Sequence, residues 1–346
     1  MTLTGEQDFL DLIDEAFPNQ GPGLVLGRGD DCAILSVTGE LCLSTDLFLE
    51  DAHFRLAYFP PEDIGYKALA VNLSDVAAMG GIPLGFSLGL AGPPELGRDF
   101  YRRLLTGMAG LSRSTGCLLT GGDLSRAARL TLCLTIWGQA AGPDFLRRGR
   151  ALAGDVLFVH AGGARSTAPL ACLGLSRAGL TVLEAGLSQD KGLEAKDFPQ
   201  AVAAHLRPEM RLDAAQALAR TGLVTALMDL SDGLAADLPR FLLRPGQTQA
   251  RALGADLDIS PDLLHPELVA LCGRTGADPT AEAFAGGEDY ALLGAVSPGD
   301  WPSLRRAVPG LCALGRVSRA PGLRLNGSIP PDRGFDHFRP YFGPAL

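Results

Sequence analysis

Lysine is scarce in this chain of 346 residues and occurs only at Lys67, Lys191 and Lys196. The formal net charge is -9 and lysine and arginine form no cluster, so nucleic acid is not expected as a main partner. Long apolar runs are also absent, since no stretch approaches the roughly 18 uninterrupted residues of a membrane-spanning helix. The first residues, MTLTGEQDFLDLIDEAF, carry acids and no basic segment, unlike a signal peptide. We therefore expect a cytoplasmic protein that binds neither nucleic acid nor membrane.

The common metal and nucleotide motifs are missing too. The seven cysteines form no CxxC pair and the five histidines form no HxxxH pair, which argues against a disulfide framework and a zinc site. No GxxxxGK[ST] sequence occurs, and GRGDDC, from Gly27 to Cys32, lacks the last glycine of a dinucleotide-binding loop. A phosphate site in this chain would therefore depend on divalent cations, glycine-loop amides and arginine. Arg148 is a candidate phosphate contact, although an arginine in a solvated linker is the simpler interpretation.

The chain does contain a mixture of helix and strand patterns, without an internal repeat. Helical patterns cover residues 6–17, 62–79, 95–114, 166–178, 199–220 and 233–243. Strand candidates are Cys32–Val37, Leu41–Thr45, Gly85–Leu90, Leu118–Thr120, Leu130–Trp137, Val156–His160, Val224–Met228, Tyr290–Ala295 and Cys312–Val317. This mixture predicts an α+β fold. The polar segment 142–155 predicts a junction between an N-terminal domain, residues 1–142, and a C-terminal domain, residues 143–346.

The pattern over residues 62–79 is apolar on nearly every side, which is typical of a buried helix. Asp75 lies within it, and buried aspartate is rare unless it is paired or bound to a metal. Asn72 is three residues away, so the two side chains share a helix face and can point at one ligand. A hydrogen bond that Asp75 accepts from the backbone, or an ion pair with Lys67, is about as good an interpretation as a metal ligand.

Five further places combine an acid with glycine, serine or threonine beside an apolar segment. They are Asp30 and Asp31 after Gly29, Asp46 at the end of CLSTD, Asp123 at the end of LLTGGD, Asp229 and Asp232 around Ser231, and Glu288 and Asp289 after a double glycine. Each acid alone is more simply a turn residue or, for Asp232, a helix cap. Together these oxygen ligands are typical of Mg²⁺, which shares its coordination with waters and substrate phosphates.

Several of these segments occur together in a known family. In this order the chain contains GRGDDCAIL, LSTDLFLEDAHF, GYKALAVNLSDVAAMGGIP, TGGDLSR, HLRPEMRL, MDLSDGLAADL, GGEDYALL and GFDHF. Over nearly its whole length it resembles the thiamine-monophosphate kinase family of the aminoimidazole-ribonucleotide-synthetase-like, or PurM-like, superfamily. The resemblance implies a two-domain PurM-like fold. Its N-terminal domain would carry a mixed sheet that forms the interface of a homodimer, and its C-terminal domain would be α+β.

The resemblance also implies an activity, transfer of the γ-phosphate of ATP to thiamine monophosphate with several Mg²⁺ ions, and roles for individual residues. The implied metal ligands are Asp30, Asp31, Ser44, Thr45, Asp46, Asp75, Asp123, Asp229 and Asp232. The implied ATP contacts are Gly122, Asp123, Arg148 and Ser231, and the implied substrate contacts are His53, Glu288 and Phe335. No catalytic base is implied, because the acceptor is already a phosphate. An unpartnered loop histidine and a packing aromatic are the simpler interpretations of His53 and Phe335.

Some positions depart from the family pattern, and two other functions stay open. HAGGARSTAPLACL has Ala164-Arg165 where Gly-Asp is usual, Leu124 replaces a common hydroxyl residue, and residues 244–256 match poorly. One alternative is a related enzyme that uses ATP to activate a carbonyl oxygen, as in purine biosynthesis or hydrogenase maturation. The other is a nucleotide-binding regulatory protein without catalysis, against which the full set of aspartates argues.

Overall fold

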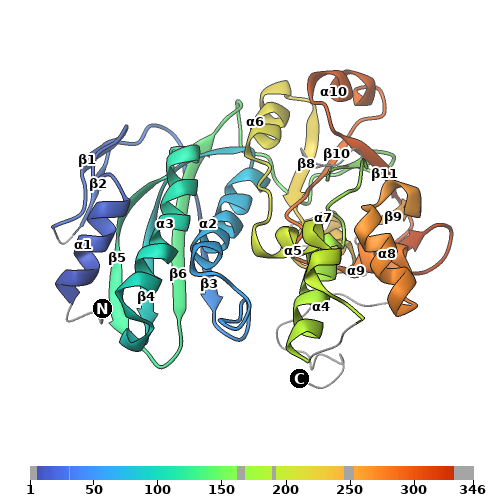
Figure 1. The fold of residues 1–346 in the computed structure, drawn as a ribbon. Helices are drawn as coiled ribbons and strands as arrows, with labels where there is room; N and C mark the ends of the chain where they lie inside the picture. The colour runs from blue at the N-terminus through green and yellow to red at the C-terminus, as the bar shows by residue number, and fades with distance from the viewer. Residues whose placement is uncertain (1–5, 31, 162–167, 189–191, 245–252, 331–346) are drawn as a thin grey trace. The chain divides into compact units, whose positions relative to one another are not determined.

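The computed structural model describes residues 6–30, 32–161, 168–188, 192–244 and 253–330 of the chain (Figure 1). The chain divides into two compact units, Met1–Leu146 with Leu206–Leu223, and Arg147–His205 with Val224–Leu346. It therefore leaves the first unit, returns to it for α6 (Leu212–Thr221), and ends in the second. Both units combine helices with a β-sheet, which confirms the predicted α+β class.

The first unit is built on a four-stranded sheet with the strand order β3-β6-β4-β5. These strands are β3 (Cys42–Leu49), β4 (Gly81–Gly92), β5 (Leu118–Arg126) and β6 (Thr131–Ala140). The sheet is mixed, because β4 runs parallel to β5 and antiparallel to β6. Figure 1 shows α1 (Glu6–Ala16), α2 (Pro61–Ala78) and α3 (Gly97–Thr115) together over one face of this sheet. β1 (Leu24–Leu26) and β2 (Ile34–Leu35) form a separate antiparallel pair, and a 3₁₀ turn, Pro94–Leu96, precedes α3.

Helix α2 begins and ends as the sequence predicts. Pro60 is its N-cap, acids fill its first turn, and it stops before Gly80, which has a left-handed φ of 64°. Most of its side chains are buried, including the polar Lys67 and Asn72. The reason is that α2 packs against α3, α6 and the strands β3, β4 and β6. The predicted burial of this helix is confirmed.

Helices α2 and α3 meet backbone to backbone at two glycines. A Cβ on Gly65 would lie 1.9 Å from the carbonyl oxygen of Leu104, and a Cβ on Gly107 would lie 1.9 Å from that of Glu62. No side chain fits at either position without separating the helices. The two glycines therefore fix how closely α2 lies against α3.

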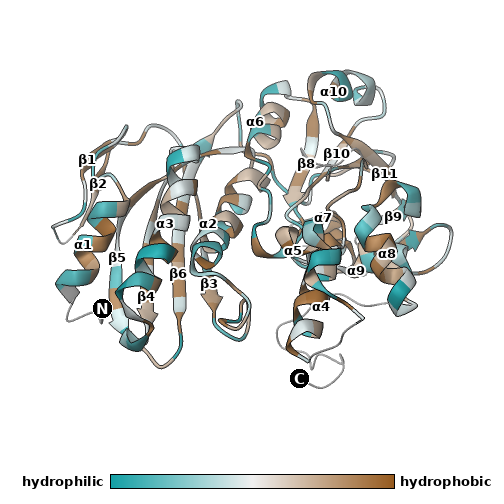
Figure 2. Cartoon of the chain, in the orientation of Figure 1, coloured by the Kyte–Doolittle hydropathy of each residue, from teal (hydrophilic) through white to brown (hydrophobic). Residues whose placement is uncertain are grey.

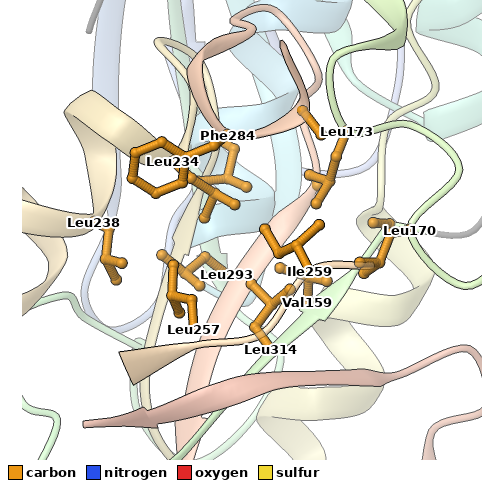
Figure 3. Close-up of a cluster of buried hydrophobic side chains, with 14 of the residues drawn as sticks. Val159, Leu170, Leu173, Leu234, Leu238, Leu257, Ile259, Phe284, Leu293 and Leu314 are labelled. Atoms are coloured by element: carbon orange, nitrogen blue, oxygen red, sulfur yellow. The ribbon is translucent and has the colours of Figure 1, made fainter. Parts of the chain in front are cut away.

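The second unit is built on a six-stranded sheet with the order β12-β9-β11-β7-β10-β8. Its strands are β7 (Val156–His160), β8 (Val224–Asp229), β9 (Gly254–Leu257), β10 (Leu292–Val296), β11 (Cys312–Ser318) and β12 (Leu323–Leu325). Its helices are α4 (Leu175–Leu187), α5 (Pro199–Leu206), α7 (Leu234–Leu242), α8 (Pro266–Thr275), α9 (Pro279–Ala285) and α10 (Trp301–Ala307), with 3₁₀ turns at Ala195–Asp197 and Pro261–Leu263. In Figure 2 the strands are mainly brown, whereas the helices carry teal stretches. Figure 3 shows the core, in which Val159 and Leu293 of the sheet lie among Leu234, Leu238 and Phe284 of the helices.

Several predicted boundaries are wrong. The strand predicted to end at Thr45 continues to Leu49, so Asp46 lies inside β3 rather than at its end. TGGD is likewise part of β5 and is not a turn. The single helix predicted for residues 199–220 is two helices, because proline at 208 lacks the N–H that an uninterrupted helix needs. The helix predicted for 166–178 begins only at Leu175, after Gly174 in a left-handed conformation.

Candidate functional site

The side chains of Ser44, Asp46 and Asp75 meet between β3 and α2. Burial alternates along β3, so Ser44 and Asp46 are half-buried while Thr45 between them is exposed. The Ser44 hydroxyl donates a hydrogen bond to Asp75 Oδ2, and Asp46 is hydrogen-bonded to the same aspartate. The strand period and the buried helix thus bring together three of the predicted metal ligands.

This cluster concentrates negative charge. The pKa of Asp46 is raised to about 6, mainly by burial and also by repulsion from, and a hydrogen bond with, the neighbouring Asp75 carboxyl. The same carboxylate contributes to the raised pKa of Cys42, although burial is the larger cause. A divalent cation would compensate the two carboxylates, and the hard oxygen donors of Ser44, Asp46 and Asp75 fit Mg²⁺. Within the described ranges, however, no three His, Cys, Asp or Glu side chains form a metal-binding group.

Asp123 and Gly122 lie on β5, the strand at the opposite edge of the same sheet from β3. Asp46 pairs with Leu134, Leu134 with Leu88, and Leu88 with Gly122, so three strand spacings separate Asp46 from Gly122. At about 4.8 Å per spacing this is roughly 14 Å, too far for Asp46 and Asp123 to share one ion within this unit. Both Gly122 and Asp123 are exposed.

Thr45 lies opposite Ser44 and Asp46 on the other face of β3. Its hydroxyl is 2.9 Å from the hydroxyl of Thr135 on β6.

His53, in the loop after β3, accepts a hydrogen bond at Nδ1 from the Leu49 N–H, at 3.0 Å, and stacks on Phe48. The interpretation of His53 as an unpartnered loop histidine is therefore wrong, whereas its contact with substrate stays a prediction.

Arg28 anchors the turn that precedes Asp30. The Arg28 guanidinium donates to the carbonyl of Leu119 at 2.8 Å and to Asp14, and the Arg28 N–H donates to Asn19 Oδ1 at 2.6 Å. These bonds attach the turn before Asp30 to α1 and to the start of β5. Sequence reasoning missed Arg28 because nothing in its local pattern indicates such distant partners. Asp31 lies outside the described residues.

In the second unit, two acidic motifs that are far apart in the sequence lie side by side. Asp229 ends β8, which pairs with β10. Beyond the strands, the Glu288 N–H donates to the Ser231 carbonyl at 2.6 Å and the Tyr290 N–H donates to the Leu230 carbonyl at 2.8 Å. The turn that carries Ser231 and Asp232 is thereby joined to the turn that carries Glu288.

Asp232 does not cap α7, in contrast to the simpler interpretation of its sequence. The N-cap residue is Gly233, and no side chain caps the helix. Arg240 instead bridges Asp232 and the buried Asp237, and Asp237 accepts a hydrogen bond from the Asp232 N–H at 2.8 Å. Burial is the main cause that raises the pKa of Asp237 to about 6. Sequence reasoning did not single out Asp237 or Arg240.

The remaining predicted residues have less structural context. Arg148 is exposed in the second unit, before β7. Phe335 and the Ala164-Arg165 pair lie outside the described part of the chain. The gathering of ligands from both halves of the chain around one substrate therefore stays a prediction.

Comparison with known proteins gives a consistent family. A family model described as AIR synthase related protein, N-terminal domain, matches residues 29–140. A thiamine-monophosphate kinase from Synechococcus elongatus is 34% identical over 96% of this chain and 96% of its own. The crystal structure of thiamine-monophosphate kinase from Stenotrophomonas maltophilia K279a has a TM-score of 0.77 at 29% identity, covering 95% of this chain and 98% of its own.

A further solved structure is described as AaThiL complexed with AMPPCP and TMP. It has a TM-score of 0.71 at 29% identity and covers 98% of this chain and 99% of its own. Among the described residues, no helix is long and apolar enough to cross a bilayer. The 34% identity over almost the full length of both chains settles the family assignment. This chain belongs to the thiamine-monophosphate kinase family.

Proposed function

We propose that the chain transfers the γ-phosphate of ATP to thiamine monophosphate, giving thiamine diphosphate and ADP. The observation that carries this proposal is the 34% identity to a thiamine-monophosphate kinase over 96% of both chains. The similar structure described as complexed with AMPPCP and TMP supports a site for a nucleotide and a second phosphate compound. Such a reaction leaves the protein mainly the tasks of positioning the reactants and compensating charge.

The proposed Mg²⁺ site includes Ser44, Asp46 and Asp75, whose grouped oxygens fit the cation. Bound Mg²⁺ would reduce the repulsion between the donor and acceptor phosphates. We propose that several Mg²⁺ ions bind in all, and that Asp30, Asp31, Thr45, Asp123, Asp229 and Asp232 supply further ligands. We assign ATP contacts to Gly122, Asp123, Arg148 and Ser231, and substrate contacts to His53, Glu288 and Phe335. No side chain is assigned as a base, because the acceptor oxygen is already ionised at neutral pH.

We further propose a cytoplasmic homodimer whose chain passes from the N-terminal to the C-terminal domain near residue 142, with residues 206–223 returning to the first unit. Leu43 and Leu47 on the outer face of β3 support the dimer, because their side chains are 68% and 54% exposed. Exposed leucines in one row along an edge strand are unfavourable in water unless another surface covers them. A second copy of the same sheet presents the same apolar row.

The activity is tested by measuring ADP release from ATP and Mg²⁺ with thiamine monophosphate, and with unphosphorylated thiamine and carboxylate or amide acceptors as controls. We expect release that depends on thiamine monophosphate and equals the thiamine diphosphate formed. Release that requires a carbonyl substrate instead would favour a related ATP-dependent enzyme. ATP binding without release under any condition would favour the regulatory protein.

The Asp75→Asn variant tests the proposed metal site. Asparagine keeps an oxygen that accepts from Ser44 but lacks the charge, so we expect kcat/KM to fall about a hundredfold or more, since charge compensation by a metal is worth several kcal/mol. Asp99→Asn on α3 makes the same chemical change on a side chain that is 68% exposed and should leave kcat/KM unchanged. Near-normal turnover by a folded Asp75→Asn enzyme would contradict the metal assignment.

A further inference from the structure

Glu288 is presented by a strained turn. Glu288 and Tyr290 both have positive φ, 61° and 48°, a backbone conformation that residues other than glycine rarely adopt. Hydrogen bonds to the carbonyls of Ser231 and Leu230 hold the main chain on both sides of Asp289. Such conformations persist only where the surrounding structure enforces them, and they are concentrated at functional sites.

Asp289, between the two strained residues, attaches this turn to the start of α4 through its buried carboxyl. Its carboxyl is buried, and Oδ2 accepts a hydrogen bond from the Gly174 N–H, at 2.8 Å, immediately before α4. The Ser176 N–H also donates to this carboxyl. The backbone that carries Glu288 is therefore attached to the start of α4 as well as to the turn after β8.

The side chain of Glu288 is held separately, by His205 near the end of α5. His205 is 2% exposed, and its Nδ1 lies 3.2 Å from Glu288 Oε2. The same nitrogen lies 3.3 Å from the hydroxyl of the buried Ser176. A carboxylate only accepts hydrogen bonds, so a hydrogen bond across this contact has Nδ1 as the donor. The Glu288 side chain is 28% exposed, which leaves it accessible to a ligand.

We propose that His205 is a positioning residue that fixes the Glu288 carboxylate for contact with the phosphate-acceptor substrate. This inference rests on the proposed function, in which Glu288 contacts that substrate. Because the backbone of Glu288 is already fixed by Ser231, Leu230 and Asp289, the remaining freedom lies in its side-chain rotamers. The donor at Nδ1 removes that freedom before the substrate arrives, which lowers the entropic cost of binding.

The experiment compares His205→Leu, which removes the donor, with His205→Asn, whose side-chain NH₂ takes nearly the place of Nδ1. Steady-state kinetics are measured with thiamine monophosphate and ATP varied in turn, for both variants, for Glu288→Ala and for the His205→Leu/Glu288→Ala pair. For His205→Leu we expect the KM for thiamine monophosphate to rise about tenfold, as for loss of a hydrogen bond to a charged group, with the KM for ATP unchanged. His205→Asn should restore most of the loss.

The double variant separates positioning from general damage to the fold. If His205 acts through Glu288, His205→Leu adds no further increase in KM once Glu288 is alanine. Additive effects, equal increases for both substrates, or a normal KM in His205→Leu would overturn the proposal while leaving the kinase assignment intact. A normal KM for thiamine monophosphate in Glu288→Ala would also overturn it, because the proposal requires that Glu288 contacts that substrate. Absence of thiamine-monophosphate turnover in the unmodified enzyme would overturn both.

Discussion

Carboxyls shielded from water in this protein differ in the groups that surround them. The half-buried Asp75 has a serine hydroxyl and a second carboxyl beside it, and the buried Asp237 has Arg240. Asp289 has two backbone N–H donors on one side, while its Oδ1 is buried with no hydrogen-bond partner within the described structure. Burial, with added repulsion from Glu288 and Asp237, raises the pKa of Asp289 well above its usual value. The native state therefore holds this proton more tightly than the unfolded chain does.

Replacement of Asp289 by asparagine should change how the free energy of unfolding depends on pH. Above the unfolded-state pKa of about 4, the unfolded chain releases a proton that the native state retains, so this group lowers the free energy of unfolding as pH rises toward the native pKa. Asparagine still accepts from the Gly174 N–H and does not ionise. Relative to the unmodified protein, the variant should gain stability with pH by up to about 1.4 kcal/mol per unit across that window.

Urea unfolding of both proteins at several pH values from 5 to 8 measures this difference. Asp262→Asn, on the 3₁₀ turn Pro261–Leu263, is the matched control, because this aspartate is exposed. Its difference from the unmodified protein should stay constant across the range. Parallel pH profiles for Asp289→Asn and the unmodified protein would show that Asp289 is ionised in the native state.

Elements with strong local signals were predictable from the sequence, and those defined by distant partners were not. The proline start, glycine end and apolar character of α2 predicted its bounds and the burial of most of its residues, whereas Asp75 itself is only half-buried. The short strands β1, β9 and β12 were missed, because three or four residues carry too little periodicity. Asp46 was recognised as an acid beside hydroxyl residues, but its place inside β3 depends on pairing with β6. The contact of His205 with Glu288 has no local signal at all.

The contact between α2 and α3 should tolerate no side chain at Gly107. We expect Gly107→Ala to lower the free energy of unfolding by about 1–3 kcal/mol, because its Cβ meets the Glu62 carbonyl and forces the helices apart. Gly110, one turn later on α3, has no atom within 4 Å of an added Cβ. Gly110→Ala should therefore raise stability by up to about 1 kcal/mol through helix propensity. Urea denaturation measures both, and equal effects of the two substitutions would contradict the close contact.

At the scale of the whole molecule, the proposed dimer depends on the outer face of β3. We expect the Leu43→Asp/Leu47→Asp variant to sediment as a monomer where the unmodified protein sediments as a dimer, because the charges make burial of this row unfavourable. Leu152→Asp, on a residue of the second unit that is 52% exposed, is the control and should leave the sedimentation coefficient unchanged. Unchanged association of the double variant would place the interface elsewhere.

The return of residues 206–223 to the first unit limits where the chain can be cut into fragments that fold. The Tyr66 hydroxyl on α2 donates to the carbonyl of Pro208, Arg207 pairs with Asp63, and α6 packs against α2. A fragment that stops at Leu146 would expose this side of α2 to water and strip neighbours from the helix that carries Asp75. Neither half of the sequence therefore corresponds to a complete folding unit, and any truncation, fusion or split-protein design has to keep the α6 segment together with the first unit.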